Sequence, residues 1–214
     1  MPGNVENIRP YGSSAGREHP EHFKRPDSLT LDIHGHIMTE GVDEEVRKHV
    51  PANTLDAVKY ASPLTRELNK KQNADRHEEL VGVTKRLADM DDMCVDVMAI
   101  SPQPPQMHYA APDALGQETA EKVNNNIANA VSQAPDRLVG LGTVPLQNTD
   151  MALKELDRLT GELGFKGIQI GAQVGDDELS AERLEPFWAR CEELDIPILL
   201  HPTSFASERF GAHY

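Results

Sequence analysis

Apolar positions along the chain repeat with two different periods, and the two periods alternate. Short apolar runs typical of buried strands lie at 94–100, 138–144, 165–170 and 196–200. Between them, apolar residues recur every three or four positions over 80–90, 115–131, 153–163 and 184–194, which predicts amphipathic helices. Thr149-Asp150 is the expected N-terminal cap of the third helix, Gly164 is its expected stop, and Ser180 is expected to open the fourth.

A further strand is predicted at 31–37, where apolar and polar residues alternate. Leu31, Ile33 and Ile37 are expected on one face, and Asp32, His34 and His36 on the other. Five strands that alternate with helices, several of them apolar on both faces, indicate an α/β fold with a parallel sheet and helices packed outside it.

Two polar segments lie outside this pattern. Residues 1–29 show no period and are expected to be a mobile arm or a surface wrap. Residues 38–76 form a long polar segment in which Pro51 and Pro63 interrupt any helix. Residues 30–214 are interpreted as part of a single domain.

Composition excludes several classes of partner. The chain has 214 residues, 38% of them hydrophobic, and a formal net charge of −14, which disfavours nucleic acid and anionic membranes. It has no run of 18 apolar residues and no signal-peptide pattern at its start. Cys94 and Cys191 lack Cys-x-x-Cys spacing, so we expect free core thiols and a cytoplasmic location.

Three histidines are the candidate metal ligands. The carboxyl ends of parallel strands share one edge, which would gather His34 and His36 from the first strand with His201 from the fifth. If the sheet curls into a barrel, these strands face each other across the axis. Three imidazoles with one open position form a typical catalytic zinc site. The alternative is ordinary polar residues on a solvent-facing strand and at a strand end.

Five motifs together resemble the amidohydrolase superfamily, in the branch of aminocarboxymuconate-semialdehyde decarboxylase and related metal-dependent decarboxylases. They are DIHGH at 32–36, RLADMD at 86–91, VGLGTVPLQ at 139–147, LGFKGIQIG at 163–171 and LLHP at 199–202. The resemblance covers about residues 30–204. It implies a (β/α)8 TIM barrel, of which about five of eight strands are present, and one zinc ion bound by His34, His36 and His201.

The resemblance also implies what this stretch does not contain. Binuclear members carry a metal-bridging lysine on strand four, whereas Lys166 lies at the start of that strand and Gln169 and Gly171 occupy its outgoing positions. One ion is therefore expected. The family's fourth ligand, an aspartate on strand eight, and its second-sphere histidine on strand six would lie beyond Tyr214, and His213 is not a substitute. The catalytic acid and base are thus unassigned, and the chain is expected to be a fragment or a half-barrel that needs a partner.

The expected activity is nonoxidative decarboxylation of a small unsaturated or aromatic carboxylic acid, with a homodimer as the full-length form. Ser101, Gln103 and His108, from the loop after the second strand, are candidate substrate contacts, or else plain loop residues. Thr203 stands where close semialdehyde decarboxylases commonly carry tryptophan, which leaves the acid open. The alternatives are a metal-dependent hydrolase or hydratase of the same branch, and a non-catalytic half-barrel that serves as a binding module.

Overall fold

A five-stranded parallel sheet forms the centre of the computed structural model, which describes residues 29–51 and 62–202. The strand order is β1-β2-β3-β4-β7. The strands are β1 (Leu31–Ile37), β2 (Val97–Pro102), β3 (Leu138–Gly142), β4 (Gly167–Gly171) and β7 (Ile198–His201). The predicted α/β class and all five strands are confirmed. Almost all of the expected polar arm, together with Thr203 and His213, lies outside the described residues.

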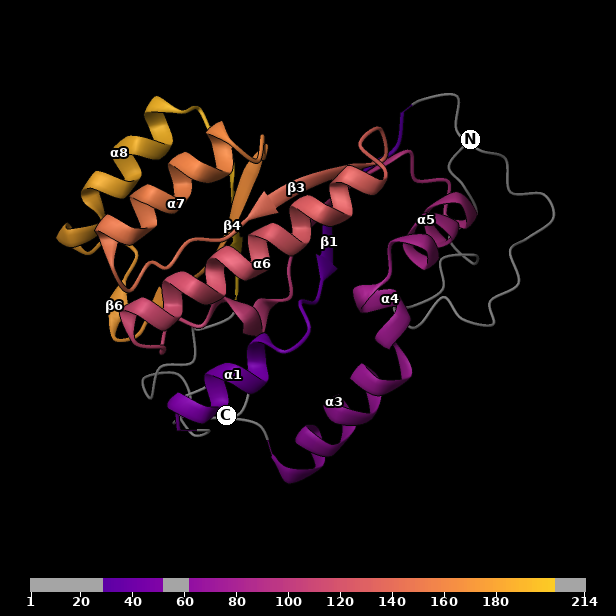
Figure 1. Ribbon diagram of the computed structural model, residues 1–214, viewed down its shortest axis with the longest axis horizontal. Helices are drawn as coiled ribbons and strands as arrows, with labels where there is room; N and C mark the ends of the chain where they lie inside the picture. The colour runs from indigo at the N-terminus through magenta and orange to yellow at the C-terminus, as the bar shows by residue number, and fades with distance from the viewer. Residues whose placement is uncertain (1–28, 52–61, 203–214) are drawn as a thin grey trace, which may run out of the picture.

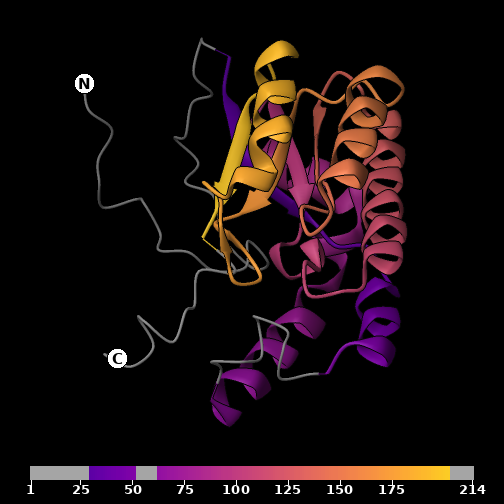
Figure 2. The same ribbon diagram turned by 90° about the vertical axis from the view of Figure 1, so that its left-hand side faces the viewer.

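Helices follow the strands and cover the sheet. They are α1 (Val42–His49), α3 (Pro63–Asp75), α4 (His77–Val81), α5 (Val83–Asp92), α6 (Asp113–Gln133), α7 (Thr149–Gly161) and α8 (Glu185–Glu193). The helix α6 contacts β2, β3 and α7, and α7 also contacts α8. In Figure 2 these helices lie along one face of the sheet. Fully buried residues such as Ile127, Leu156 and Ile168 fill the space between the two layers.

Three helices turn into the next strand in the same way. Two or three residues after the end of α5, α7 and α8 lies a residue in the left-handed region, namely Cys94 (φ 57°), Gly164 (φ 65°) and Asp195 (φ 48°). A backbone bond closes each turn: Val95 to Met90 (2.8 Å), Phe165 to Leu159 (3.0 Å) and Ile196 to Cys191 (3.2 Å). The bonds of Val95 and Ile196 span five residues, as in a Schellman motif, whereas that of Phe165 spans six; all three satisfy free helix carbonyls. The helix α7 ends at Gly161, three residues before the expected stop, and Gly164 supplies the left-handed turn that follows.

Several expected boundaries were wrong. Pro63 occupies the first turn of α3 after the cap residue Ser62, where its missing N–H costs nothing, so it starts a helix instead of only interrupting one. The predicted helix over 80–90 is split at Gly82 into α4 and α5. Ser180 lies in a turn, and the fourth helix begins with the short 3-10 helix η4 (Glu182–Leu184) before α8. The short antiparallel strands β5 (Gln173–Val174) and β6 (Asp177–Glu178) were not predicted.

The strand β1 is less regular than its alternation predicts. Its pairing with β2 shifts between Asp32 and Gly35, and Ile37 is buried whereas Leu31 is 57% and Ile33 71% exposed. The predicted common face of these three residues is therefore wrong. The irregularity changes the register, and among the described residues β1 pairs with β2 alone, so its first half lacks the cover that a central strand would have.

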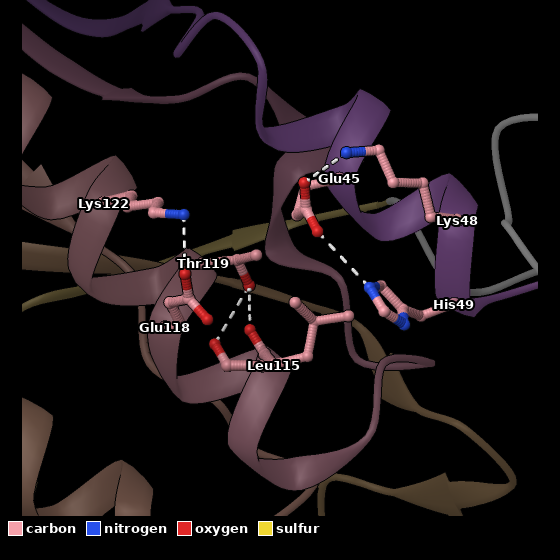
Figure 3. Close-up of polar contacts among 8 residues, drawn as sticks. Glu45, Lys48, His49, Leu115, Glu118, Thr119 and Lys122 are labelled. Carbon is pink, nitrogen blue, oxygen red and sulfur yellow. Dashed lines mark hydrogen bonds and ion pairs between the residues drawn. The ribbon is translucent and has the colours of Figure 1, made fainter.

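The lower part of the molecule in Figure 1 holds α1 and α3. A small second core of Val46, Val50 and Ala111, with Leu115 against it, packs α1 onto α6. Figure 3 shows the polar contacts around it: Glu45 bonds Lys48 and His49 along α1, and the Thr119 hydroxyl bonds the Leu115 carbonyl within α6. Within residues 29–51 and 62–202, no helix combines the length and apolarity needed to cross a membrane.

Candidate metal centre

The end of β1 presents two histidines from one strand. The His34 backbone N–H donates to Asp32 Oδ1 at 3.0 Å, which fixes the chain through the irregular step. Gly35 lies so close to β2 that a Cβ there would be 2.7 Å from Met98 Sδ. The missing side chain lets β1 approach β2, and His34 and His36 emerge on either side of this glycine.

His201 joins them from the other end of the sheet. The ring centroids of His201 lie 5.4 Å from His34 and 5.2 Å from His36. β1 and β7 are four strand spacings apart, which would be about 19 Å in a flat sheet at about 4.8 Å per strand. The sheet must therefore curve strongly, with these side chains pointing into its concave side, as in part of a barrel.

The ring nitrogens form a cluster of metal-ligating geometry. One nitrogen from each of His34, His36 and His201 lies within 4.8 Å of the others. The His34 and His36 Nε2 atoms are 3.1 Å apart, and two nitrogens bound to one ion at about 2.1 Å would be roughly 3.0–3.4 Å apart. Among the described residues, the buried Nδ1 of His201 has no hydrogen-bond partner. The three imidazoles thus fit a shared divalent cation.

Burial favours the neutral form of two of these rings, His36 and His201, because it lowers the pKa of each. Burial, with His34 and His201 nearby, lowers the pKa of His36 to about 4. Burial and His34 also lower the pKa of His201. Neutral imidazole is the form that binds metal, so both rings have their lone pairs available at neutral pH.

The candidate substrate residues separate into three places. Ser101 is fully buried beneath His36, with its Oγ 3.1 Å from His36 Nδ1. Gln103 follows β2 and lines a cavity of about 830 Å³ between α1 and α3, together with Arg47 and Lys70. His108 is buried, with φ 48°, and its Nε2 lies 3.1 Å from Asp43 Oδ1 without the alignment of a hydrogen bond. The structure thus brings only Ser101 into contact with the histidines.

One residue that supports the centre was quoted only as part of a motif. Arg86, on α5, is buried, and its Nη2 donates to the His36 carbonyl at 2.7 Å and to the Glu79 carbonyl at 3.1 Å. Burial lowers its pKa. The signal that could have identified Arg86 is an arginine at a buried position of the helix that precedes a strand. A buried guanidinium requires hydrogen-bond acceptors nearby.

The expected single-ion arrangement agrees with β4. Lys166 precedes this strand and is exposed, whereas Gln169 is fully buried within it. In the described residues, the three histidines form the one cluster of ligand-type side chains with metal-binding spacing.

Comparison with known proteins fits this geometry. A family model described as amidohydrolase matches residues 31–213. The chain belongs to the amidohydrolase family. It is 35% identical over 117 residues to 2-amino-3-carboxymuconate-6-semialdehyde decarboxylase of Dictyostelium discoideum. This matched stretch covers 55% of this chain and 33% of the relative. The expected decarboxylase branch is confirmed.

Two further matches span more of this amidohydrolase chain. The 2-keto-4-carboxy-3-hexenedioate hydratase of a Sphingobium strain is 26% identical over 87% of this chain and 56% of its own. The 5-carboxyvanillate decarboxylase of Novosphingobium aromaticivorans, solved with manganese and 4-hydroxy-3-methoxy-5-nitrobenzoic acid, is 26% identical with a TM-score of 0.70. That match covers 83% of this chain and 51% of the other. The chain therefore spans about a third to just over half of these relatives, and its five strands form a half-barrel.

Proposed function

We propose that this chain supplies the histidine side of a divalent-metal centre for nonoxidative decarboxylation of a small unsaturated or aromatic carboxylic acid. The observation that carries the proposal is the convergence of His34, His36 and His201 from opposite ends of the sheet. Two decarboxylase relatives, one of which binds manganese and an aromatic acid, support the reaction class.

The residues of this chain would divide the work. His34, His36 and His201 would hold the ion, which as a Lewis acid would draw electron density from substrate oxygens. Arg86 holds the His36 backbone and Ser101 its ring, so the ligand atoms are already oriented. Gln103 lines a cavity that holds Arg47, Arg66 and Lys70 beside the carboxylates Glu40, Asp43 and Glu44 and that none of the three histidines lines, so its contact with the acid stays a prediction. The proton that replaces carbon dioxide would come from a group outside the described residues.

Substrate contacts for Ser101 and His108 remain predictions, and we propose a different role for each residue. Ser101 lies beneath His36, so we propose that it acts through that ring. His108 contacts Asp43, whose side chain borders the cavity, and we propose that it holds this wall in place. The cytoplasmic location and the homodimer also remain predictions; the free thiols of Cys94 and Cys191 support a reducing compartment.

Metal content after purification tests the centre. We expect near-stoichiometric divalent metal in the unmodified chain and its loss in both His34→Ala and His201→Ala. Three imidazoles favour zinc, and the manganese of the carboxyvanillate enzyme makes that ion the competing identity, so both should be quantified and reloaded. His49→Ala is the matched control because His49 is an exposed histidine on α1. A folded, metal-free chain that takes up neither ion would overturn the proposal.

Product analysis separates decarboxylation from the second candidate, hydration. The hydratase relative supports this second reaction, in which water adds to a double bond and no carbon dioxide leaves. The metal-loaded protein should be incubated with aromatic and unsaturated di- and monocarboxylic acids while carbon dioxide is measured. Release of carbon dioxide supports decarboxylation; clean hydration or lactone hydrolysis without it would reverse the order. Metal binding without any turnover would favour the non-catalytic half-barrel.

A further inference from the structure

Gln169 is an unusual residue for the middle of a parallel strand. It is fully buried on β4, and an amide buried without partners is costly. Both of its polar ends have partners: Nε2 donates to the Pro102 carbonyl at 2.9 Å, and Oε1 accepts from Ser101 Oγ at 2.8 Å. The orientation of the amide follows from chemistry, because a flipped amide would set its oxygen against the Pro102 carbonyl oxygen.

The same two partners meet the His36 ring. His36 Nδ1 lies 3.1 Å from the Pro102 carbonyl and 3.1 Å from Ser101 Oγ. The Ser101 hydroxyl has one hydrogen and three possible acceptors: Gln169 Oε1 at 2.8 Å, the Gly35 carbonyl at 3.0 Å and, if unprotonated, His36 Nδ1 at 3.1 Å. An unprotonated Nδ1 would set its lone pair against the Pro102 carbonyl oxygen, which cannot donate. The hydrogen therefore goes to Gln169, the nearest acceptor, or to Gly35, and Ser101 Oγ offers the ring a lone pair.

Nδ1 of His36 therefore faces two acceptors and must carry the ring hydrogen. The second nitrogen, Nε2, then has a free lone pair, and it is the atom that lies 3.1 Å from His34 Nε2 in the cluster. We propose that Gln169 is a positioning residue, which through Ser101 and Pro102 holds His36 in the tautomer and ring orientation that metal binding requires. This inference rests on the proposed function for its purpose, but the tautomer itself can be measured without metal.

The test compares two buried glutamines. Gln169→Met has similar volume and removes both hydrogen bonds to the network around His36. Gln106→Met is the matched control, because Gln106 is also buried. Its side-chain amide makes two hydrogen bonds, with the Thr39 N–H and the Thr39 carbonyl at 2.8 Å each, and both lie outside the network around His36. Both variants should lose some stability, whereas only Gln169→Met should change His36.

Two readouts follow from the proposal. Nitrogen NMR of 15N-histidine-labelled, metal-free protein should show Nδ1-protonated His36 in the unmodified chain and in Gln106→Met, and a mixture of tautomers in Gln169→Met. In competition with a chelator, metal affinity should fall about 10- to 100-fold in Gln169→Met, as is typical when a partner of a ligating histidine is lost, and less than about 3-fold in Gln106→Met. Ser101→Ala is the second variant if Gln169→Met does not fold, with the same expected direction.

The outcomes separate this inference from the proposed function. Unchanged tautomer and unchanged affinity in Gln169→Met or Ser101→Ala would overturn the role of Gln169 while leaving the metal centre intact. An unmodified chain that binds no metal would overturn the proposed function, and the tautomer measurement would then still decide the inference. Equal losses of affinity in Gln169→Met and Gln106→Met would show a general structural effect and count against it.

Discussion

Asn124 is the side chain whose replacement we expect to cost most stability. It is fully buried on α6 and joins three elements. Its Nδ2 donates to the Thr143 carbonyl at 2.8 Å and to Glu155 Oε1 at 2.6 Å, and its Oδ1 accepts from the Thr143 N–H at 2.9 Å. Asn124→Leu keeps the number and branching of the side-chain heavy atoms and removes all three bonds. Its methyl groups are larger than the amide, so the measured loss contains a packing contribution beside the lost bonds.

The magnitude follows from the groups left behind. Thr143 would keep a buried N–H and a buried carbonyl without this partner, at about 1–3 kcal/mol each. Glu155 would lose one charged hydrogen bond, worth about 1.5–3 kcal/mol, but would retain Arg158 Nη2 at 2.7 Å. Allowing for relaxation, we expect the free energy of unfolding to fall by about 4 kcal/mol, a large share of the roughly 5–15 kcal/mol of a typical domain.

Urea unfolding followed by circular dichroism measures this loss. With a slope of about 2 kcal/mol/M, the midpoint should fall by about 2 M. Asn126→Leu is the control on the same helix, since Asn126 is partly exposed and its Nδ2 lies 3.4 Å from the Met38 carbonyl; it should cost about 0.5 kcal/mol or less. A loss below about 1 kcal/mol for Asn124→Leu would refute the reasoning.

Three further predictions concern turns, thiols and the buried arginine. Gly164 and Cys94 both occupy left-handed turns, which glycine adopts without strain. Gly164→Ala should therefore lower the free energy of unfolding by about 1–2 kcal/mol, whereas Cys94→Gly should leave it unchanged or raise it. Thermal melts measure both changes, and equal effects of the two substitutions would contradict the prediction. Burial raises the pKa of Cys191 to about 11, so at pH 8 its thiolate fraction is small and a thiol reagent should label Cys94 first; labelling of Cys191 should rise as the pH approaches 11 or when urea unfolds the chain, and fast labelling at pH 8 would count against this. Arg86→Lys should lower the free energy of unfolding by about 2 kcal/mol, because a single ammonium cannot reproduce the planar donors that reach His36 and Glu79; an unchanged melting temperature would show that these contacts contribute little.

The sequence predicted the fold best where periodicity and packing agree. The strands β2, β3 and β4 are apolar runs because each lies between two neighbours and packs against helices, and such runs are readable without a structure. The apolar run of β7 was equally readable, although β7 ends the described sheet and Leu200 is 55% exposed. Helix starts were less predictable. Ser180 has the residue type of an N-cap, but it lies in the turn after β6, and the 3-10 helix η4 comes before α8. This start depends on contacts such as the bond from the Thr149 hydroxyl to the Arg183 carbonyl. Those contacts join residues more than 30 positions apart.

In the candidate site, too, some residues were predictable from the sequence and others were not. His34, His36 and His201 were predictable because residues at parallel strand ends gather at one edge and because the motifs resemble a known family. The supporting residues were not. Arg86 reaches the His36 carbonyl across 50 positions, and Ser101 reaches Gln169 across 68. Such bonds depend on the register between strands, and in β1 simple alternation missed the shift between Asp32 and Gly35.

The curvature of the sheet gives the three histidines a second physical consequence. β1 and β7 stand at opposite ends of the strand order, so no backbone ladder between them holds the concave shape in the described part of the chain. A cation bound to His34, His36 and His201 would connect these two strands directly, and its binding energy would then stabilise the curved form against flatter ones. The mutual distances of the rings show that the sheet is curved, and buried side chains of α6, α7 and α8 share one core with its strands. A bound cation would therefore hold the same geometry from the concave side that helix packing supports from outside.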